Sequence, residues 1–265
     1  MRAFFRNWKR RASFSACGNE DRRENSVLTG GGVFLPMHLV MFDIDGTLTD
    51  TMKVDALCFV RAFAEVCGFG DIDTDWSRYQ HATDVGIFYE IFEARLGRLP
   101  TGEEISRFHQ HFMSLLVEAS KERPFAAVPG AAQLLSLLAD RGMYKVSLAT
   151  GCWSDSARLK MASAGMCYDA YPSASCDDAP ERDSIIKLSM QKAVSRFGGP
   201  FVSAVYVGDG VWDARACRKV GIPFIGIGTG GRAEKLAAEG AVLVLRDFSD
   251  SDLFLDGLDR IAQTG

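Results

Sequence analysis

The chain has 265 residues, of which 47% are hydrophobic and 24% charged, and its net charge is -4. This composition argues against long disorder, a collagen-like repeat or a disulfide scaffold, and the acidic balance gives no reason to expect nucleic-acid binding. No apolar run reaches the ~20 residues needed to span a bilayer. The seven cysteines form no Cys-x-x-Cys pair and their number is odd, which favours a reduced, cytoplasmic protein without a membrane partner.

The N-terminal segment differs in charge from the rest. Residues 1–36 hold seven Arg and Lys and three Asp and Glu, a local charge of +4, so the remainder carries -8. Such a segment is typical of a basic, disordered tail, but also of a targeting peptide. A third interpretation is that translation begins at Met37. We expect a tail that is not part of the fold.

The first predicted element is a short strand. Leu39 to Phe42 is a continuous apolar run that ends abruptly in Asp-Ile-Asp-Gly. This pattern is typical of a buried parallel strand followed by a polar loop at its carboxyl end.

The character of the chain changes over residues 54–126. Apolar residues recur there at helical spacing, first over 57–67 and then over 85–96 and 103–120, and glycines and a proline separate the helical stretches. No convincing strand interrupts them. We therefore predict a small helical domain, 54–126, inserted after the first strand.

From Pro129 onward the predicted elements alternate. In chain order they are a helix at 131–141, a strand at 145–149, a helix at 155–164, a weak strand at 170–173, a helix at 183–196, a strand at 204–207, a helix at 213–220, a strand at 224–227, a helix at 233–240, a strand at 241–245 and a final helix. This alternation predicts an α/β fold with a doubly wound parallel sheet. The core domain would comprise residues 37–53 and 127–265.

Polar residues follow three of these strands. Asp43 comes after the first strand, Thr150 after the second and Asp209 after the fourth. Because parallel sheets bind ligands outside the carboxyl ends of their strands, we expect these three residues to converge on one site.

The pair Asp43 and Asp45 carries the clearest chemical signal. A carboxylate at the end of a buried strand needs a partner, and a divalent cation is a natural one. Ionised, such a carboxylate can attack phosphorus, and a second carboxyl group nearby can serve as general acid and base. Gly46 permits the tight turn between them and the next segment. The alternative is an ordinary Asp-Gly turn that caps a helix.

The string from Phe42 to Thr51 resembles the first motif of the haloacid dehalogenase superfamily of phosphohydrolases, an apolar strand followed by Asp-x-Asp-Gly-Thr. The resemblance implies a Rossmann-like core, with Asp43 as nucleophile and Asp45 as general acid and base. It also implies Mg²⁺ as cofactor, held by the Asp43 carboxylate and the Asp45 backbone carbonyl.

Two further segments match motifs of that superfamily in the right order. Val146 to Gly151 fits the second motif, in which the hydroxyl of Thr150 and the free N–H at Gly151 would bind a phosphoryl oxygen. Gly208 to Asp213 fits the fourth, Gly-Asp-x-x-x-Asp. There Asp209 would be a direct metal ligand and Asp213 would lie behind it and orient metal-bound water. The alternatives are a helix cap for Thr150 and a turn with a cap for the second segment.

The third motif of the superfamily usually offers a Lys, often followed by Pro. In this chain Arg182 stands at the expected distance, and Lys187 is the competing cation one turn or more into the next helix. We expect Arg182 to bind the phosphate, because Arg is always charged and grips phosphate bidentately. Lys187 is more simply a solvated helix residue.

The inserted helices resemble the cap of one subgroup, which closes over small substrates and excludes water. Thr83 and Asp84 interrupt the apolar pattern there and could contact substrate, or they could simply cap the next helix. His109 and His111 resemble a metal pair, but residues two apart on a helix face different directions. We therefore do not expect them to bind a metal.

The combined signal predicts a Mg²⁺-dependent phosphomonoesterase that acts on a small phosphorylated metabolite through an aspartyl-phosphate intermediate. A phosphomutase with the same intermediate is the main alternative. A haloacid dehalogenase is less favoured, because Asp45 supplies a leaving-group proton that dehalogenation does not need. A non-catalytic binding protein is hard to reconcile with the full set of acidic positions. The sequence indicates neither the substrate nor the oligomeric state.

Overall fold

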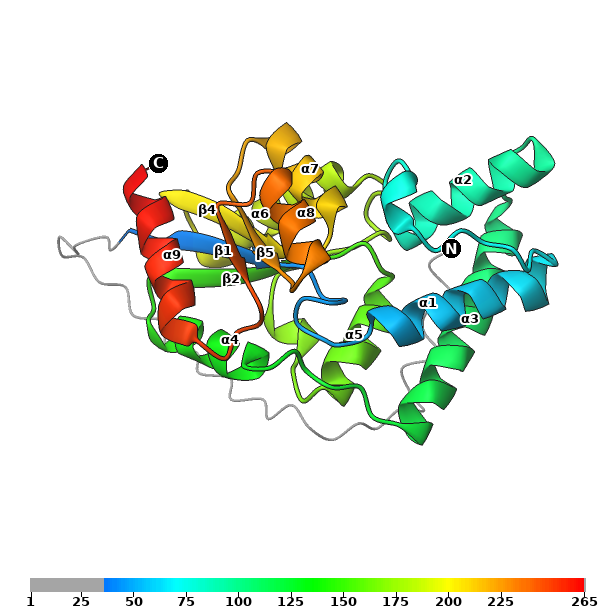
Figure 1. Cartoon of the computed structure of the whole chain (residues 1–265), viewed down its shortest axis with the longest axis horizontal. Helices are drawn as coiled ribbons and strands as arrows, with labels where there is room; N and C mark the ends of the chain where they lie inside the picture. Colours follow the sequence, from blue (N-terminus) through cyan, green and yellow to red (C-terminus); the bar gives the residue numbers. More distant parts are fainter. Residues whose placement is uncertain (1–35, 265) are drawn as a thin grey trace. The chain divides into compact units, whose positions relative to one another are not determined.

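The structure is a computed structural model, and it describes residues 36–264 (Figure 1). The three interpretations of the N-terminal segment fall on residues 1–35, outside the described part. None of the described helices is long and apolar enough to cross a membrane. Six cysteines lie in the described part, and Cys58, Cys152, Cys176 and Cys217 among them are buried.

The described chain contains one six-stranded parallel sheet in the order β3-β2-β1-β4-β5-β6. Its first strand in the sequence, β1, is paired on both sides, with Val40 opposite Val146 of β2 and Val205 of β4. The strands, in chain order, are β1 (His38–Phe42), β2 (Tyr144–Ala149), β3 (Ser173–Ala174), β4 (Ser203–Gly208), β5 (Phe224–Ile227) and β6 (Leu243–Leu245). The predicted doubly wound parallel sheet is confirmed.

Helices cover both faces of the sheet (Figure 1). Leu39 and Met41 of β1 pack into one apolar cluster, whereas Val40 and Phe42 pack into the other. All four side chains are fully buried, and each contributes about 1.5–3 kcal/mol relative to an exposed position. The first cluster includes residues of α6 (Arg182–Phe197), α7 (Val211–Val220) and α8 (Gly231–Ala238), and the second includes residues of α4 (Ala131–Asp140), α5 (Ser154–Ser163) and α9 (Ser251–Thr264).

The segment between β1 and α4 is helical, as predicted. It contains α1 (Met52–Ala62), the π-helical turn η2 (Phe63–Cys67), the 3₁₀ turn η3 (Trp76–Arg78), α2 (Asp84–Leu96) and α3 (Gly102–Glu122). Phe59 of α1 holds these helices together, since its ring centroid lies 5.2 Å from those of Phe63 and Phe108 and 5.6 Å from that of Phe112. Such edge-on aromatic pairs add about 0.5–1.5 kcal/mol each beyond their burial.

Two predicted strands are displaced. Where a weak strand was expected at 170–173, the residues Tyr168–Ala170 form the 3₁₀ turn η4, and only Ser173 and Ala174 pair with β2. The strand expected at 241–245 begins at Leu243, because the left-handed Gly240 (φ 94°) first turns the chain out of α8. Both are edge strands, where a short sequence carries little periodicity.

Candidate active site

The three residues expected to converge follow three neighbouring strands. Because β1 lies between β2 and β4, Asp43 leaves the sheet between Thr150 and Asp209. The backbone N–H of Asp43 donates to the Val207 carbonyl (2.9 Å), which continues the β1–β4 ladder up to the site. All three residues are buried, with at most 3% of their surface exposed. The topology thus brings the three residues to the same edge of the sheet, as expected.

The turn after β1 requires glycine for two reasons. Gly46 has a φ of 78°, which lies in the left-handed region that side chains with a Cβ avoid. In addition, a Cβ at this position would lie 2.2 Å from an Asp209 carboxylate oxygen. The turn therefore approaches the fourth motif so closely that only a glycine fits.

Three carboxylates form a cluster at this edge. One oxygen from each of Asp43, Asp209 and Asp213 lies within 4.8 Å of the others. Burial raises the pKa of all three groups, and the Oδ1 atom of Asp209 is buried without a hydrogen-bond partner among the described residues. Carboxylate oxygens are hard ligands, and a divalent cation such as Mg²⁺ would offset the unfavourable desolvation of these buried groups. Asp213 also accepts a hydrogen bond from the Gly210 N–H (3.1 Å), so it is a helix cap as well as a member of the cluster.

Arg182 is the cation that faces the cluster. Its Nη1 lies 3.2 Å from Asp43 Oδ1 and 3.1 Å from Asp213 Oδ1, and its side chain is 8% exposed. Its Nη2 donates to the carbonyl of Ala82 (3.3 Å). Burial lowers the pKa of Arg182, but Asp213 and Asp43 outweigh this effect and the pKa is raised well above its ordinary value, so the guanidinium stays charged.

Lys187, the competing cation, lies away from this cluster. Its side chain is 52% exposed and pairs with Asp183 one turn earlier on α6, at 3.1 Å. It is absent from the residues that line the active-site cavity. The geometry therefore favours Arg182, as expected from the sequence.

Asp45 is held by residues that the sequence analysis did not identify. Its Oδ1 accepts a hydrogen bond from the Thr51 hydroxyl (2.5 Å), and its Oδ2 pairs with Lys160 Nζ (2.8 Å). The fully buried Lys160 also pairs with Asp55 of α1. Burial lowers the pKa of Lys160, yet the carboxylates, Asp45 first, raise it well above normal. A local signal existed, because Lys160 lies on the apolar stripe of α5 beside Met161.

Thr150 and Gly151 both line the cavity at the end of β2. The Thr150 hydroxyl lies 3.1 Å from Cys152 Sγ and lines the cavity. It does not cap α5, whose N-cap is Trp153, so the helix-cap alternative for Thr150 is wrong. A Cβ on Gly151 would lie 2.7 Å from an Arg182 nitrogen, which shows how closely the backbone approaches the guanidinium.

The loop before α2 joins the helical segment to the site. Ala82 has a left-handed φ of 46°, and this orientation presents its carbonyl to Arg182. Thr83 accepts from the Gly86 N–H (3.1 Å) and donates to the Pro180 carbonyl (2.7 Å). The expected role of Thr83 in substrate binding is not supported, because its hydroxyl caps α2 and holds this loop, and it does not line the cavity.

Asp84, the other predicted residue of this loop, does line the cavity. Its backbone N–H donates to the Gly151 carbonyl (2.8 Å), and its Oδ2 accepts from the Trp153 N–H (3.2 Å). Burial raises its pKa well above the ordinary value, and the neighbouring Asp55 raises it further. Asp84 is thus a buried carboxyl group in the lining of the cavity.

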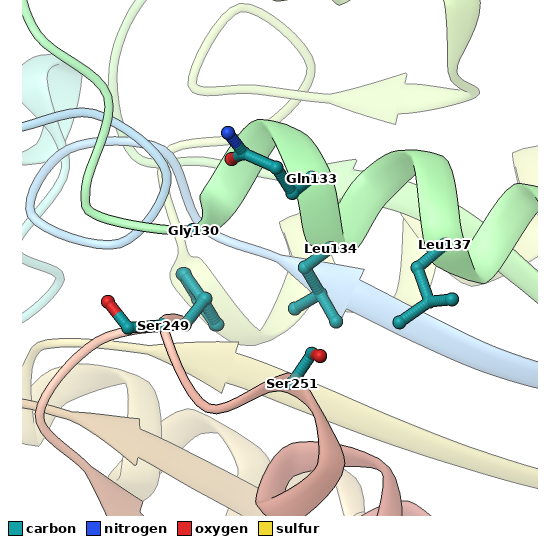
Figure 2. A pocket seen from close by; sticks show the side chains of 7 residues that line it. Gly130, Gln133, Leu134, Leu137, Ser249 and Ser251 are labelled. Atoms are coloured by element: carbon teal, nitrogen blue, oxygen red, sulfur yellow. The ribbon is translucent and has the colours of Figure 1, made fainter.

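The site cavity is small, about 50 Å³. Its lining consists of Asp43, Asp45, Met52, Asp55, Phe59, Trp76, Ala82, Asp84, Ile87, Thr150, Gly151, Cys152, Arg182 and Trp212. A larger pocket, of about 460 Å³, lies between α4 and the loop that precedes α9 (Figure 2). Its lining side chains, such as Leu134, Leu137 and Ser249, include no titratable group, so it offers no comparable chemistry.

The two histidines of α3 and Arg232 of α8 lie outside the cavity lining. His109 bonds to Asp155 (2.9 Å) and His111 to Glu65, so they face different partners and do not form a metal pair, as expected. Arg232 at the start of α8 donates to Asp209 Oδ2 (2.7 Å). Its position after a Gly-Thr-Gly-Gly run that follows β5 was a sequence signal for this contact.

The structure thus places a carboxylate cluster and a buried arginine at the carboxyl edge of an α/β sheet, where such sheets bind their ligands. The model of the haloacid dehalogenase-like hydrolase family matches residues 37–221. The chain belongs to this family, and it is therefore an enzyme of the hydrolase type.

Solved structures share the fold. A hydrolase from Pseudomonas syringae aligns with a TM-score of 0.66 at 21% identity and covers 84% of this chain and 98% of its own. CbbY from Rhodobacter sphaeroides, in complex with phosphate, aligns at 0.65 and 23%, with 84% and 99% covered. A putative beta-phosphoglucomutase from Bacteroides vulgatus aligns at 0.64 and 19%, with 86% and 91% covered. No curated protein matches the chain.

Proposed function

We propose that this chain is a Mg²⁺-dependent phosphomonoesterase that hydrolyses a small phosphorylated metabolite through an aspartyl-phosphate on Asp43. The observation that carries the proposal is the position of Asp43. Its buried carboxylate contacts Arg182 and forms a cluster with the carboxylates of Asp209 and Asp213. A nucleophile so placed can be neutralised by the guanidinium and by a bound metal ion while it attacks phosphorus.

The residues that would hold the metal are Asp43, the Asp45 backbone carbonyl and Asp209, with Asp213 behind them. A bound Mg²⁺ would supply charge neutralisation and orientation of the phosphoryl oxygens. The carboxylates present fit that ion, since one of them leaves a buried oxygen without a partner and all of them are desolvated.

The phosphoryl group would be bound by Arg182, by the Thr150 hydroxyl and by the backbone N–H at Gly151. Arg182 already contacts the nucleophile at 3.2 Å, so a phosphoryl group on Asp43 would lie within reach of its fork of donors. The same guanidinium would offset the negative charge that builds up in the transition state.

Asp45 would act as general acid and base. It would protonate the leaving oxygen and later take a proton from the water that attacks the aspartyl-phosphate. Thr51 and Lys160 fix the orientation of its carboxylate.

The helical segment 54–126 would serve as a cap over a core made of residues 37–53 and 127–265. The contacts of Ala82, Thr83 and Asp84 with Arg182, Pro180 and Gly151 tie it to the core loops around the cavity. A closed cap excludes water from the nucleophile, and it must open for substrate to enter a cavity this small.

The second candidate function is a phosphomutase, which uses the same aspartyl-phosphate and Asp45. It is favoured by the structural likeness to a putative beta-phosphoglucomutase. A dehalogenase is less well supported, because Asp45 and the acidic cluster supply a proton and a metal site that dehalogenation does not use.

The test is release of inorganic phosphate from an aryl phosphate and from a panel of phosphorylated metabolites, with Mg²⁺ and with EDTA. We expect activity with Mg²⁺, loss of activity on chelation, and at least a ~10³-fold loss in Asp43→Asn. Asp50→Asn is the matched control, since Asp50 lies in the same loop but is exposed, and it should keep wild-type activity. Full activity in Asp43→Asn would rule out the aspartyl mechanism, and isomerised sugar phosphate without phosphate release would indicate the mutase.

A further inference from the structure

We infer that the leaving group of the substrate carries hydroxyl or amino groups and no second negative charge. This inference rests on the proposed function and names the class of substrate: a phosphate ester of a small neutral or amino alcohol, as opposed to a phosphorylated carboxylic acid or a bisphosphate. It follows from the charges around the cavity, where acidic side chains outnumber basic ones by more than the proposed reaction requires.

The first observation is the imbalance in the lining. Among the described residues that line the cavity, the carboxyl groups of Asp43, Asp45, Asp55 and Asp84 face a single basic side chain, that of Arg182. Arg182 is already in contact with two carboxylates and a carbonyl. The transferred phosphoryl group would bind to its remaining N–H donors. The proposed Mg²⁺ would also lie on the phosphoryl side, beside Asp43. A second anion on the leaving group would therefore find no uncommitted basic side chain in the described lining, and burying an unpaired charge is costly.

The nearest other cations are already committed. Lys160 is fully buried behind the lining and is shared between Asp45 and Asp55. Arg232 lies outside the lining and pairs with Asp209 at 2.7 Å. Neither can turn to a substrate anion without leaving a buried carboxylate without its ionic partner, which is strongly unfavourable.

The positive end of α2 is also occupied. A helix N-terminus attracts anions, and α2 begins at the edge of the cavity. However, Thr83 accepts from the Gly86 N–H at 3.1 Å, and Asp84 places its own carboxyl group in the first turn. The helix therefore presents an acid to the substrate where an anion-binding helix would present free N–H groups.

Asp84 is the side chain that would bind the leaving group and discriminate among substrates. Its Oδ2 accepts from the Trp153 N–H, while its Oδ1 accepts no hydrogen bond from the described residues and the side chain lines the cavity. A hydroxyl or ammonium donor on the substrate would satisfy it. The lining also offers a hydrogen-bond donor. The buried Nε1 of Trp212 has no partner in the described chain and can donate to an alcohol oxygen.

The apolar part of the lining fits the same class. Phe59, Trp76 and Trp212 supply aromatic surface around the acids. Aromatic faces accept carbon-bound hydrogens and cations, but they give no stabilisation to a carboxylate or a second phosphate. The cavity thus combines acceptors and π-faces on the leaving-group side with cationic character only on the phosphoryl side.

The experiment compares three phosphate esters of matched length: phosphoethanolamine, 2-hydroxyethyl phosphate and phosphoglycolate, which differ in the terminal amine, alcohol or carboxylate. For the wild type with Mg²⁺ we expect kcat/KM to be at least ~10-fold lower for phosphoglycolate than for either of the other two. Asp84→Asn should raise kcat/KM for phosphoglycolate and lower it for phosphoethanolamine, so that their ratio changes by at least ~10-fold. Asn keeps an acceptor for the Trp153 N–H, and thermal unfolding would verify that the variant folds.

Asp73→Asn is the matched control, since Asp73 is an exposed acid of the same helical segment that pairs with Arg78, and it should leave the ratio unchanged. Equal rates for the three esters, or a preference for phosphoglycolate that Asp84→Asn does not alter, would overturn the inference. An aryl phosphate serves as a separate readout. If it is hydrolysed while phosphoglycolate is preferred, only this inference fails, whereas absence of hydrolysis with Mg²⁺ refutes the proposed function itself.

Discussion

Replacing Arg182 by alanine is the sharpest perturbation of the site. The change removes the guanidinium that lies 3.2 Å from Asp43 and 3.1 Å from Asp213, and it leaves both carboxylates buried without a cation. The matched variant is Lys187→Ala on the same helix, which removes an exposed cation from a surface pair with Asp183. The two variants therefore separate the phosphate-binding role from a general loss of positive charge.

The structure sets the expected magnitudes. Removal of one partner from a buried ion pair costs about 3–5 kcal/mol, so Arg182→Ala should destabilise the metal-free protein by that amount. Loss of a donor aimed at the developing charge costs about 10²–10³ in kcat. Lys187→Ala should change stability by less than ~1 kcal/mol, because exposed pairs contribute little, and it should leave kcat unchanged. Arg182→Lys should be intermediate, since lysine keeps the charge but loses the fork of donors.

The assay is kcat/KM for release of phosphate from an aryl phosphate at about pH 8 with Mg²⁺, with urea unfolding of each variant in parallel. Alkaline pH is chosen because the raised pKa of Asp213, about 7, lets this carboxyl group protonate at lower pH and so hides part of the cost. The reasoning would be refuted if Lys187→Ala lost more activity than Arg182→Ala, since the third motif would then belong to Lys187.

Three other predictions concern the surroundings of the nucleophile. Lys160→Met should lower kcat by at least ~10-fold with little change in KM, because Asp45 loses its ionic partner while the phosphoryl site is untouched; an unchanged kcat would contradict this. Gly46→Ala should destabilise the protein by about 1–3 kcal/mol and weaken Mg²⁺ binding, because the new Cβ strains a left-handed residue and lies 2.2 Å from an Asp209 oxygen; urea unfolding and metal titration measure both. In EDTA the melting temperature should fall as pH rises from about 4 to 7, because burial raises the pKa of Asp213 from 3.8 to about 7 and folding must then bury its charge. Mg²⁺ should remove most of this loss at about pH 8, and a melting temperature that rises with pH in EDTA would contradict the sign.

Local patterning determined most of the core from the sequence. The apolar run at Leu39 to Phe42 predicts β1 because a strand buried on both faces needs no polar side chains. The alternation of helical and apolar segments predicts the parallel sheet. Parallel order then places Asp43, Thr150 and Asp209 at one edge, and this inference required no knowledge of side-chain contacts.

The tertiary structure decided what holds these residues. Lys160 follows Asp45 by 115 residues, and only the packing of α5 beneath the site brings its ammonium to that carboxylate. The assignment of Thr83 depended on the same kind of information, since capping α2 and binding a ligand both call for a hydroxyl at the start of a helix. Its 2.7 Å hydrogen bond to the Pro180 carbonyl joins two loops 97 residues apart, and no local pattern encodes that distance.

The sequence by itself therefore determined which groups can do chemistry and at which edge of the sheet they lie, because backbone periodicity fixes the strands and their direction. It did not determine the charge balance of the cavity. That balance depends on which carboxylates share a buried cation, and burial raises the energetic cost of every pairing that is left incomplete. Only the packed structure assigns Lys160 to Asp45 and Asp55 and places Asp84 in the cavity lining without a basic partner of its own among the described residues.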